Sequence, residues 1–332
     1  MAVHNGLPHL PDAVESILGQ SLADFEFLIV DDASTDGSSE YLALQTDPRI
    51  RLITNATNQG LTRSLNHGLD EAQGDYVARM DHDDLSLPGR LAAQVTSMDA
   101  HPEVDVLGAW ARTLGLDPEQ TWRYPLTDAD IRAELLFASV LVHSSVMLRR
   151  ASLDQHKLRY DPNIARAQDY ELWTRAAAHL RFANLGEVLL RYRVHPEQIG
   201  AQQNAEQQAV ADEVRARQLA ALGLQPSLEE LAQHNAIARW DFGPSAADLD
   251  RVEAWLLHLA EANRAAGRCA PDSLARALER RWWSACRHAR LLGLEAWRRY
   301  RTSPLSDGVR RGPRQKSGFF ADAVLREWGF RQ

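Results

Sequence analysis

The chain has 332 residues, 45% of them hydrophobic and 25% charged, with a formal net charge of −8. This is the composition of an ordinary globular protein, and no stretch approaches the roughly 20 apolar residues of a membrane span. Met1–Gly6 lacks the charged start and apolar core of a signal peptide. Two cysteines without CxxC spacing exclude a disulfide framework and a zinc motif, so we expect a cytoplasmic protein.

The charge is unevenly distributed along the chain. From Arg268 to the end the net charge is +9, and the remainder carries −17. The acidic part argues against a nucleic-acid partner. The basic tail, which contains Trp282, Trp283 and Trp297, has three interpretations: peripheral contact with the inner face of a membrane, a partner interface, or packing of a helical appendage with solvated arginines.

Strands and helices alternate in the first hundred residues. The pattern predicts strands at the very start of the chain, at 25–30, 49–54 and 76–80, with helices at 11–19, 38–44 and 61–72 between them. Such alternation indicates βαβ units and a parallel sheet. Further strands are expected at 104–110, 142–148 and 188–194, and a helix is expected from Ala167.

Carboxylates follow two of these strands. Asp31 and Asp32 end the strand at 25–30, and Asp81, Asp83 and Asp84 follow the strand at 76–80. Ligands of parallel sheets bind at the carboxyl ends of the strands, so both groups fall where a site is expected. No GxGxxG follows the first strand and no GxxxxGK[ST] occurs, which disfavours a dinucleotide fold and a P-loop.

Asp81 and Asp83 predict a divalent cation. If the strand continues to its end, both side chains lie on one face. Two carboxylates about 5 Å apart repel each other by roughly 3 kcal/mol at an effective dielectric of 20, so a positive charge should lie between them. Oxygen ligands favour a hard metal. The alternative is a solvated acidic turn before the helix near Pro88.

Beyond residue 200 the pattern becomes helical. We expect helices at 204–222, 247–266, 273–300 and 319–328, with a loose segment at 307–318.

Four segments in this order resemble glycosyltransferase family 2. They are Phe25–Ser38, Asn58–Leu61 with Asn66, Gly74–Asp84 and Gln168–Trp173. The resemblance implies a GT-A fold: a Rossmann-like, mostly parallel α/β sheet flanked by helices, here with a C-terminal α-helical appendage. It implies an inverting enzyme that takes a nucleotide-sugar donor, of UDP type, and Mn²⁺ or Mg²⁺. We predict a GT-A domain at 1–200, with a nucleotide-sugar half at 1–115 and an acceptor half at 116–200, and a helical region at 201–332.

The resemblance also assigns residues to the donor and the metal. Asp32 corresponds to the carboxylate that recognises the nucleotide base, since a carboxylate accepts N–H groups of a pyrimidine edge. Asp81 and Asp83 correspond to the DxD motif, with Asp81 near the ribose and metal and Asp83 as the direct metal ligand. The backbone of the first strand, at Ala2 and Val3, would line the base pocket.

Further residues are assigned on the acceptor side and around the nucleotide. Asp169 corresponds to the general base that takes a proton from the acceptor hydroxyl; its alternative is a first-turn helix carboxylate. His195 resembles a metal-binding imidazole, or is a loop residue. Asn58 and Arg63 would reach the nucleotide, or form a turn and an exposed helix position.

The first strand is short in comparison with the family, which suggests a start codon upstream of Met1 or a truncated strand. Two other functions stay open. One is a non-catalytic nucleotide-sugar-binding protein, which the short first strand allows. The other is a nucleotidyltransferase, which would need a basic, glycine-rich loop where Asn5-Gly6-Leu7-Pro8 stands. The main prediction is sugar transfer to an unidentified hydroxyl, of a glycan or lipid-linked glycan, in cell-surface polysaccharide or glycoconjugate synthesis.

Overall fold

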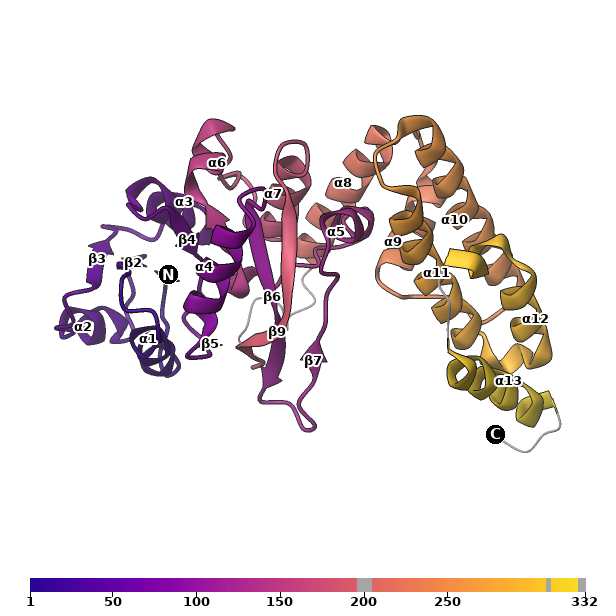
Figure 1. Ribbon diagram of the computed structural model, residues 1–332, viewed down its shortest axis with the longest axis horizontal. Coiled ribbons are helices and arrows are strands. Elements are labelled where there is room, and N and C mark those ends of the chain that lie inside the picture. Colours follow the sequence, from indigo (N-terminus) through magenta and orange to yellow (C-terminus); the bar gives the residue numbers. More distant parts are fainter. Residues whose placement is uncertain (196–204, 309–311, 328–332) are drawn as a thin grey trace. The chain divides into compact units, whose positions relative to one another are not determined.

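The computed structural model describes residues 1–195, 205–308 and 312–327, and the chain forms two compact units (Figure 1). The first unit contains Met1–Ile131 and Ser139–Ala211. The second contains Arg132–Ala138 and the chain from Asp212 onward. The predicted α/β architecture with a helical C-terminal part is confirmed.

The chain begins with a three-stranded parallel sheet. Strands β1 (Ala2–Val3), β2 (Phe27–Asp31) and β3 (Ile50–Thr54) lie in the order β1-β2-β3. Helices α1 (Leu10–Leu18), α2 (Ser38–Ala43) and α3 (Leu61–Glu71) connect or follow them. The parallel pairing predicted from strand–helix alternation is therefore confirmed for these three strands. It is wrong for the strand predicted at 76–80, which pairs antiparallel with Met147–Arg149 in a second sheet. The strand ends carrying Val3 and Asp31 are direct neighbours.

A second sheet of six strands follows. Strands β4 (Tyr76–Ala78), β8 (Met147–Arg149), β6 (Val106–Leu114), β9 (Phe182–Arg193) and β5 (Leu85–Ser86) lie in that order, and β7 (Thr121–Trp122) pairs with β6. Only β6 and β9 run parallel among these pairs. Helices α4 (Arg90–Ala100), α6 (Arg150–Gln155) and α7 (Gln168–Ala176) and the 3₁₀ turn η1 (His143–Ser145) belong to this part of the chain.

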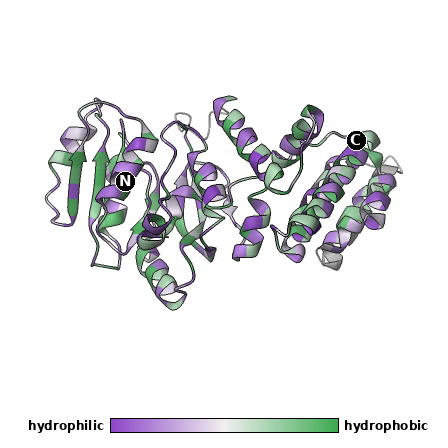
Figure 2. Ribbon diagram, turned by 90° about the horizontal axis from the view of Figure 1, so that it is seen from above, coloured by the Kyte–Doolittle hydropathy of each residue, from purple (hydrophilic) through white to green (hydrophobic). Residues whose placement is uncertain are grey.

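Apolar burial explains why these elements form. In β2, Phe27, Ile29 and Val30 are buried, and in α1 Leu10, Val14 and Ile17 are buried at helical spacing. Figure 2 shows hydrophobic residues along the strands of the first unit, whose helices carry both hydrophobic and hydrophilic residues. The strands of the first unit therefore lie in an apolar layer, and polar side chains follow at the strand ends.

The second unit consists of helices. After α5 (Asp128–Glu134) come α8 (Ala205–Ala221), α9 (Leu228–Ala238), α10 (Ala246–Ala266), α11 (Pro271–His288), α12 (Leu294–Thr302) and α13 (Pro313–Glu327), with 3₁₀ turns η2 (Arg290–Leu292) and η3 (Pro304–Gly308). The single helix predicted over 273–300 is wrong: it breaks at Gly293, whose φ of 54° suits glycine. Helix α9 was not predicted, and α13 begins inside the segment expected to be loose.

The tryptophans of the basic tail are core residues. Trp282 is fully buried, and Trp283 and Trp297 are at most 9% exposed. Trp283 and Trp297 pack edge-on against Phe319. These indole rings are therefore not available to a membrane surface. Among the described residues, no helix is both long and apolar enough to cross a bilayer.

Residues 132–138 are held inside the helical unit by polar contacts. Glu134 accepts hydrogen bonds from Arg280 and from the buried Arg281 at 2.8 Å. His234 Nε2 lies 3.0 Å from the Leu136 carbonyl oxygen, and Arg215 Nε donates to the Phe137 carbonyl at 2.7 Å. This short segment thus belongs to the core of the second unit.

Candidate functional site

The carboxylates of Asp81, Asp83 and Asp84 lie together, each offering an oxygen within 4.8 Å of the others. The expected reason was wrong: β4 ends at Ala78, so strand alternation does not bring Asp81 and Asp83 to one face. A bend over residues 82–84 gathers all three side chains instead. We call residues 81–84 the acidic loop.

Asp84 fastens the acidic loop to its surroundings. Its side chain is fully buried and accepts hydrogen bonds from the Ser144 hydroxyl and, at 2.8 Å, from the Arg193 backbone N–H. Burial, followed by the charges of Asp81 and Asp83, raises the pKa of Asp84 well above its usual value. Asp84 therefore joins the loop to η1 and β9, and its oxygens are already engaged.

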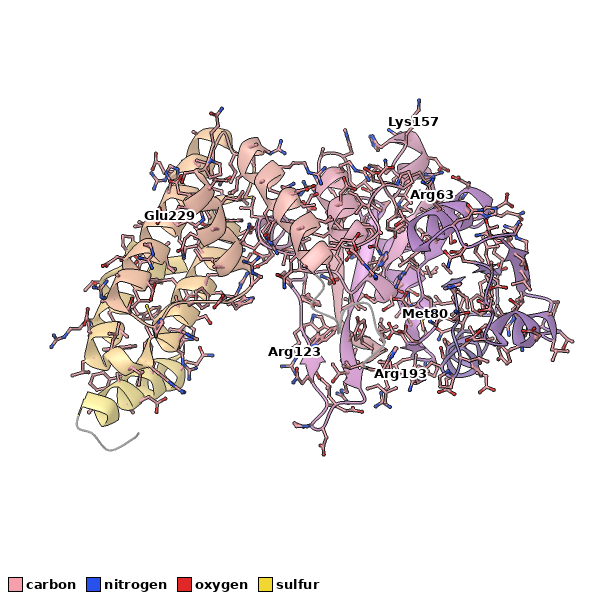
Figure 3. All side chains as sticks on the ribbon, turned by 180° about the vertical axis from the view of Figure 1, so that it is seen from behind. Arg63, Met80, Arg123, Lys157, Arg193 and Glu229 are labelled. Carbon is pink, nitrogen blue, oxygen red and sulfur yellow. The ribbon has the colours of Figure 1, made fainter. Side chains whose placement is uncertain are left out.

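The end of β9 reaches the acidic loop at two further points. Arg193 Nε donates to the Asp83 backbone carbonyl at 2.7 Å. His195 Nε2 lies 3.1 Å from Asp83 Oδ2, and both side chains are largely buried. In Figure 3, Arg193 and Met80, which precedes the acidic loop, lie in the same region of the first unit. The structure thus brings the predicted metal ligands Asp81, Asp83 and His195 together.

Arg79 is a residue of this site that the sequence did not single out. Its guanidinium is buried and forms an ion pair with Asp81, and its Nε is buried with no hydrogen-bond partner among the described residues. Burial alone would lower the pKa of Arg79, but the charge and hydrogen bond of Asp81, together with the charges of Tyr160 and Asp84, raise it, so Arg79 stays cationic. The feature of the sequence that could have indicated this role is a charged arginine inside an apolar strand pattern.

One cleft of about 610 Å³ collects most of the predicted site residues. Those that line it are Ala2, Val3, Asp32, Asn58, Asp81, Asp83, Asp169 and His195. Arg63 does not line the cleft: its side chain is exposed on α3, and Figure 3 shows it well apart from Met80. A second cavity of about 670 Å³ beside β2 and β4 contains none of the predicted carboxylates.

Asp32 is fixed at the end of β2 by several donors. Its carboxylate accepts hydrogen bonds from the Asn55 side chain at 2.8 Å, the Gln59 N–H at 2.9 Å and the Gly60 N–H at 2.8 Å. Burial alone would raise its pKa, but these hydrogen bonds together lower it. Asp32 is therefore an ionised acceptor, and its backbone N–H donates to the Val3 carbonyl at 2.7 Å.

Asp169 lies in the first turn of α7, the helix that precedes β9 of the second sheet. The residue before the helix, Ala167, has a left-handed φ of 51°. Burial raises the pKa of Asp169, which also accepts hydrogen bonds from the Tyr170 N–H and the Ser139 hydroxyl. A raised pKa makes a carboxylate a stronger base.

His143 lines the same cleft. It is half-buried beside Tyr160, with His143 Nε2 2.7 Å from the Tyr160 hydroxyl. Burial, followed by the charge of Arg79, lowers the pKa of His143 well below its usual value, so its imidazole is neutral. A neutral ring can donate and accept hydrogen bonds without adding charge to the cleft.

The donor set of the acidic loop fits a hard divalent cation. Asp81 and Asp83 supply carboxylate oxygens and His195 supplies an imidazole nitrogen, a combination that suits Mg²⁺ or Mn²⁺ and lacks the sulfur that softer ions prefer. Asp81 and Asp83 are only partly buried, so a cation can reach them from the cleft.

Comparison with known proteins gives a consistent result. The sequence model of Glycosyl transferase family 2 matches residues 1–157. The putative glycosyltransferase EpsE of Bacillus subtilis is 34% identical over 58% of this chain and 71% of its own length. The O-antigen biosynthesis glycosyltransferase WbnJ of Escherichia coli is 30% identical over 59% of this chain and 78% of its own.

Solved structures of low identity share the fold. TarS 1–349 of S. aureus, in complex with UDP-GlcNAc, is 15% identical and superimposes with a TM-score of 0.57 over 87% of this chain and 88% of its own. A longer TarS chain is 16% identical and superimposes with a TM-score of 0.55. The match covers 94% of this chain and 55% of that longer chain.

Proposed function

Because this chain belongs to glycosyltransferase family 2, we propose that it transfers a sugar, with inversion, from a UDP-type nucleotide sugar to an acceptor hydroxyl in polysaccharide or glycoconjugate synthesis. The chain is a glycosyltransferase, as its relatives are named. The observation that carries the proposal is the single cleft in which Asp32, the acidic loop and Asp169 meet.

The nucleotide would lie at the carboxyl edge of the parallel sheet. Ala2, Val3 and Asn58 line this part of the cleft, and Asp32 offers an ionised carboxylate to the N–H of a pyrimidine edge. Asn58 Oδ1 accepts the Gly60 N–H at 2.9 Å, which fixes the loop that carries it. The UDP-GlcNAc complex of the fold relative TarS is compatible with this choice of donor class.

Asp83, Asp81 and His195 would hold Mn²⁺ or Mg²⁺ beside the diphosphate. Such an ion neutralises charge on the leaving group. Arg193 and Asp84 keep the acidic loop in place through the contacts at the end of β9. Arg79 balances part of the negative charge on Asp81 before any ligand arrives.

Asp169 would act as the general base. It accepts the proton of the acceptor hydroxyl while that oxygen forms a bond to the anomeric carbon. The bond between the anomeric carbon and the diphosphate oxygen breaks, and the diphosphate leaves with the electron pair. Attack from the face opposite the leaving group inverts the anomeric configuration.

Calorimetric titration with UDP tests the donor side. In the presence of Mg²⁺ the parent protein should bind UDP about ten-fold more tightly than in EDTA, and Asp83→Ala should abolish this difference. Asp117→Ala, which removes an exposed carboxylate on the loop after β6, is the matched control and should behave as the parent. Equal affinity of Asp83→Ala and the parent in Mg²⁺ would show that Asp83 does not bind the metal.

A further inference from the structure

Three aromatic side chains form one side of the cleft, and we call Trp122, Tyr124 and Tyr192 the aromatic wall. Trp122 lies on β7 and Tyr192 on β9, the strands that flank β6. Their ring centroids are 4.7 Å apart at an interplanar angle of 45°. Trp122 pairs in register with Ala111 of β6, whose small side chain leaves room for the rings to meet.

The aromatic wall extends from the acidic loop to the general base. At one end, Tyr192 directly precedes Arg193, whose backbone N–H donates to the Asp84 carboxylate at 2.8 Å. At the other end, burial and the nearby charge of Asp169 raise the pKa of Tyr124. A molecule lying against the wall is therefore placed between the diphosphate site and Asp169, where an acceptor has to be.

The three rings are half-buried rather than buried. On one side they pack against a core cluster that includes Ala111 and Leu190, and on the other they face the cleft. A cleft that combines this aromatic face with carboxylates, imidazoles and amides suits a ligand with both apolar and polar character. A pyranose ring has this combination, with a face of C–H groups and a rim of hydroxyls.

Polar groups of the same cleft match the hydroxyl rim. Ser139, His143 and Gln168 line the cleft together with Asp169. They offer a hydroxyl, a neutral imidazole and an amide, all able to pair with sugar hydroxyls. We infer that the acceptor of the proposed transfer is a carbohydrate whose pyranose ring stacks on the aromatic wall and presents a hydroxyl to Asp169. This inference rests on the proposed function.

Saturation-transfer difference NMR tests the inference directly. The probes are methyl glycosides of glucose, galactose, mannose, rhamnose and N-acetylglucosamine, each recorded with Mg²⁺ and with or without UDP. At least one glycoside should show saturation on its ring C–H protons. Trp122→Ala should weaken its binding about five-fold, the scale of one stacking contact, and Trp122→Phe should retain most of it.

Two controls separate this result from misfolding and from failure of the proposed function. UDP signals should be the same in the parent and both Trp122 variants. Trp240→Ala, which removes an exposed tryptophan of the helical unit, should leave the glycoside signals unchanged. Lack of UDP signals in the parent would count against the proposed donor. Absence of glycoside signals, or signals unchanged in Trp122→Ala, would overturn the carbohydrate acceptor and favour a lipid or peptide hydroxyl.

Discussion

His195 Nε2 lies 3.1 Å from Asp83 Oδ2, although 112 positions separate the two residues in the chain. The contact forms because β9 ends beside the acidic loop, where Arg193 binds both the Asp83 carbonyl and the Asp84 carboxylate. Two residues at one strand end, Arg193 and His195, thus contact two acidic residues of another segment.

Loss of the His195 imidazole should weaken metal binding. In His195→Ala we expect the affinity for Mn²⁺ in the presence of UDP to fall about ten-fold, since one of three proposed ligands is removed. The measurement is the electron paramagnetic resonance signal of free Mn²⁺ during titration. His179→Ala, which removes an exposed imidazole, serves as the control. An unchanged affinity for Mn²⁺ in His195→Ala would mean that His195 is a loop residue and not a metal ligand.

Replacing Asp169, the proposed general base, should raise the stability of the protein and lower its activity. Burial raises the pKa of Asp169 above its unfolded value, so this group's stabilising contribution is present at low pH and is lost as the pH rises through the folded pKa. At pH 7, Asp169→Asn should therefore be more stable than the parent, by about 0.5–2 kcal/mol. Asparagine cannot take up the proton, so transfer should fall about 10²- to 10⁴-fold.

Urea denaturation at pH 7 and a donor-turnover assay measure the two effects of Asp169→Asn. UDP binding should not change. Asp117→Asn, an exposed carboxylate of the same unit, should alter neither stability nor turnover. Full turnover in Asp169→Asn would remove Asp169 as the base, and lower stability would contradict the cost assigned to its buried charge.

The buried pair of Glu134 and Arg281 should be costly to break. Both side chains are at most 8% exposed, and Arg281 also lies 3.5 Å from the Phe137 ring centroid. Glu134→Gln removes the carboxylate charge that pairs with the buried Arg281, so we expect a loss of about 3–5 kcal/mol in the free energy of unfolding. Chemical denaturation measures it, with the exposed Glu229→Gln as control. An equal loss of unfolding free energy in Glu134→Gln and Glu229→Gln would contradict a particular cost of breaking the buried pair.

His234 should make the helical unit sensitive to acid. Burial lowers the pKa of His234 to about 3, with the Leu136 carbonyl bonded at Nε2 and the Trp255 indole donating to Nδ1. Between pH 6.5 and 3 the unfolded imidazole takes up a proton and the folded one does not, so stability falls as the pH falls, by about 1.4 kcal/mol per unit. Denaturation at several pH values checks this slope.

His234→Gln retains a donor toward the Leu136 carbonyl and removes the titrating ring. Its stability should be lower than that of the parent at pH 7 but should depend less on pH below 6.5. His101→Gln, which replaces an exposed histidine, should keep the parent's slope. The same slope in His234→Gln and the parent would assign the acid sensitivity to other groups.

Local sequence patterns predicted the strands and the places where they end. Alternating apolar segments located β2 and β3, and the carboxylates after β2 and β4 marked the edge that carries the cleft. These features depend on residues close together in the chain, where apolar spacing and turn chemistry act directly. Asp32 and the acidic loop could therefore be proposed from the sequence.

Features that depend on pairing between distant segments could not be predicted in this way. The contact of Asp83 with His195 forms because β9 lies between β5 and β6 and pairs with both strands. Arg79 looked like a strand residue, because its partner Asp81 is turned toward it only by the bend after β4. The break at Gly293 depends on one backbone conformation, which helix-forming neighbours on both sides concealed.

Residues 132–138 limit how evolution or an engineer can recombine this protein. Leu136 and Phe137 are buried in one cluster with residues of α10 and α11, so a polypeptide ending at residue 200 would present these side chains to water in the middle of its chain. Exposed apolar surface of this kind promotes aggregation. Exchange of the helical unit between related enzymes therefore requires a matching exchange at 132–138, so the two segments should be inherited together.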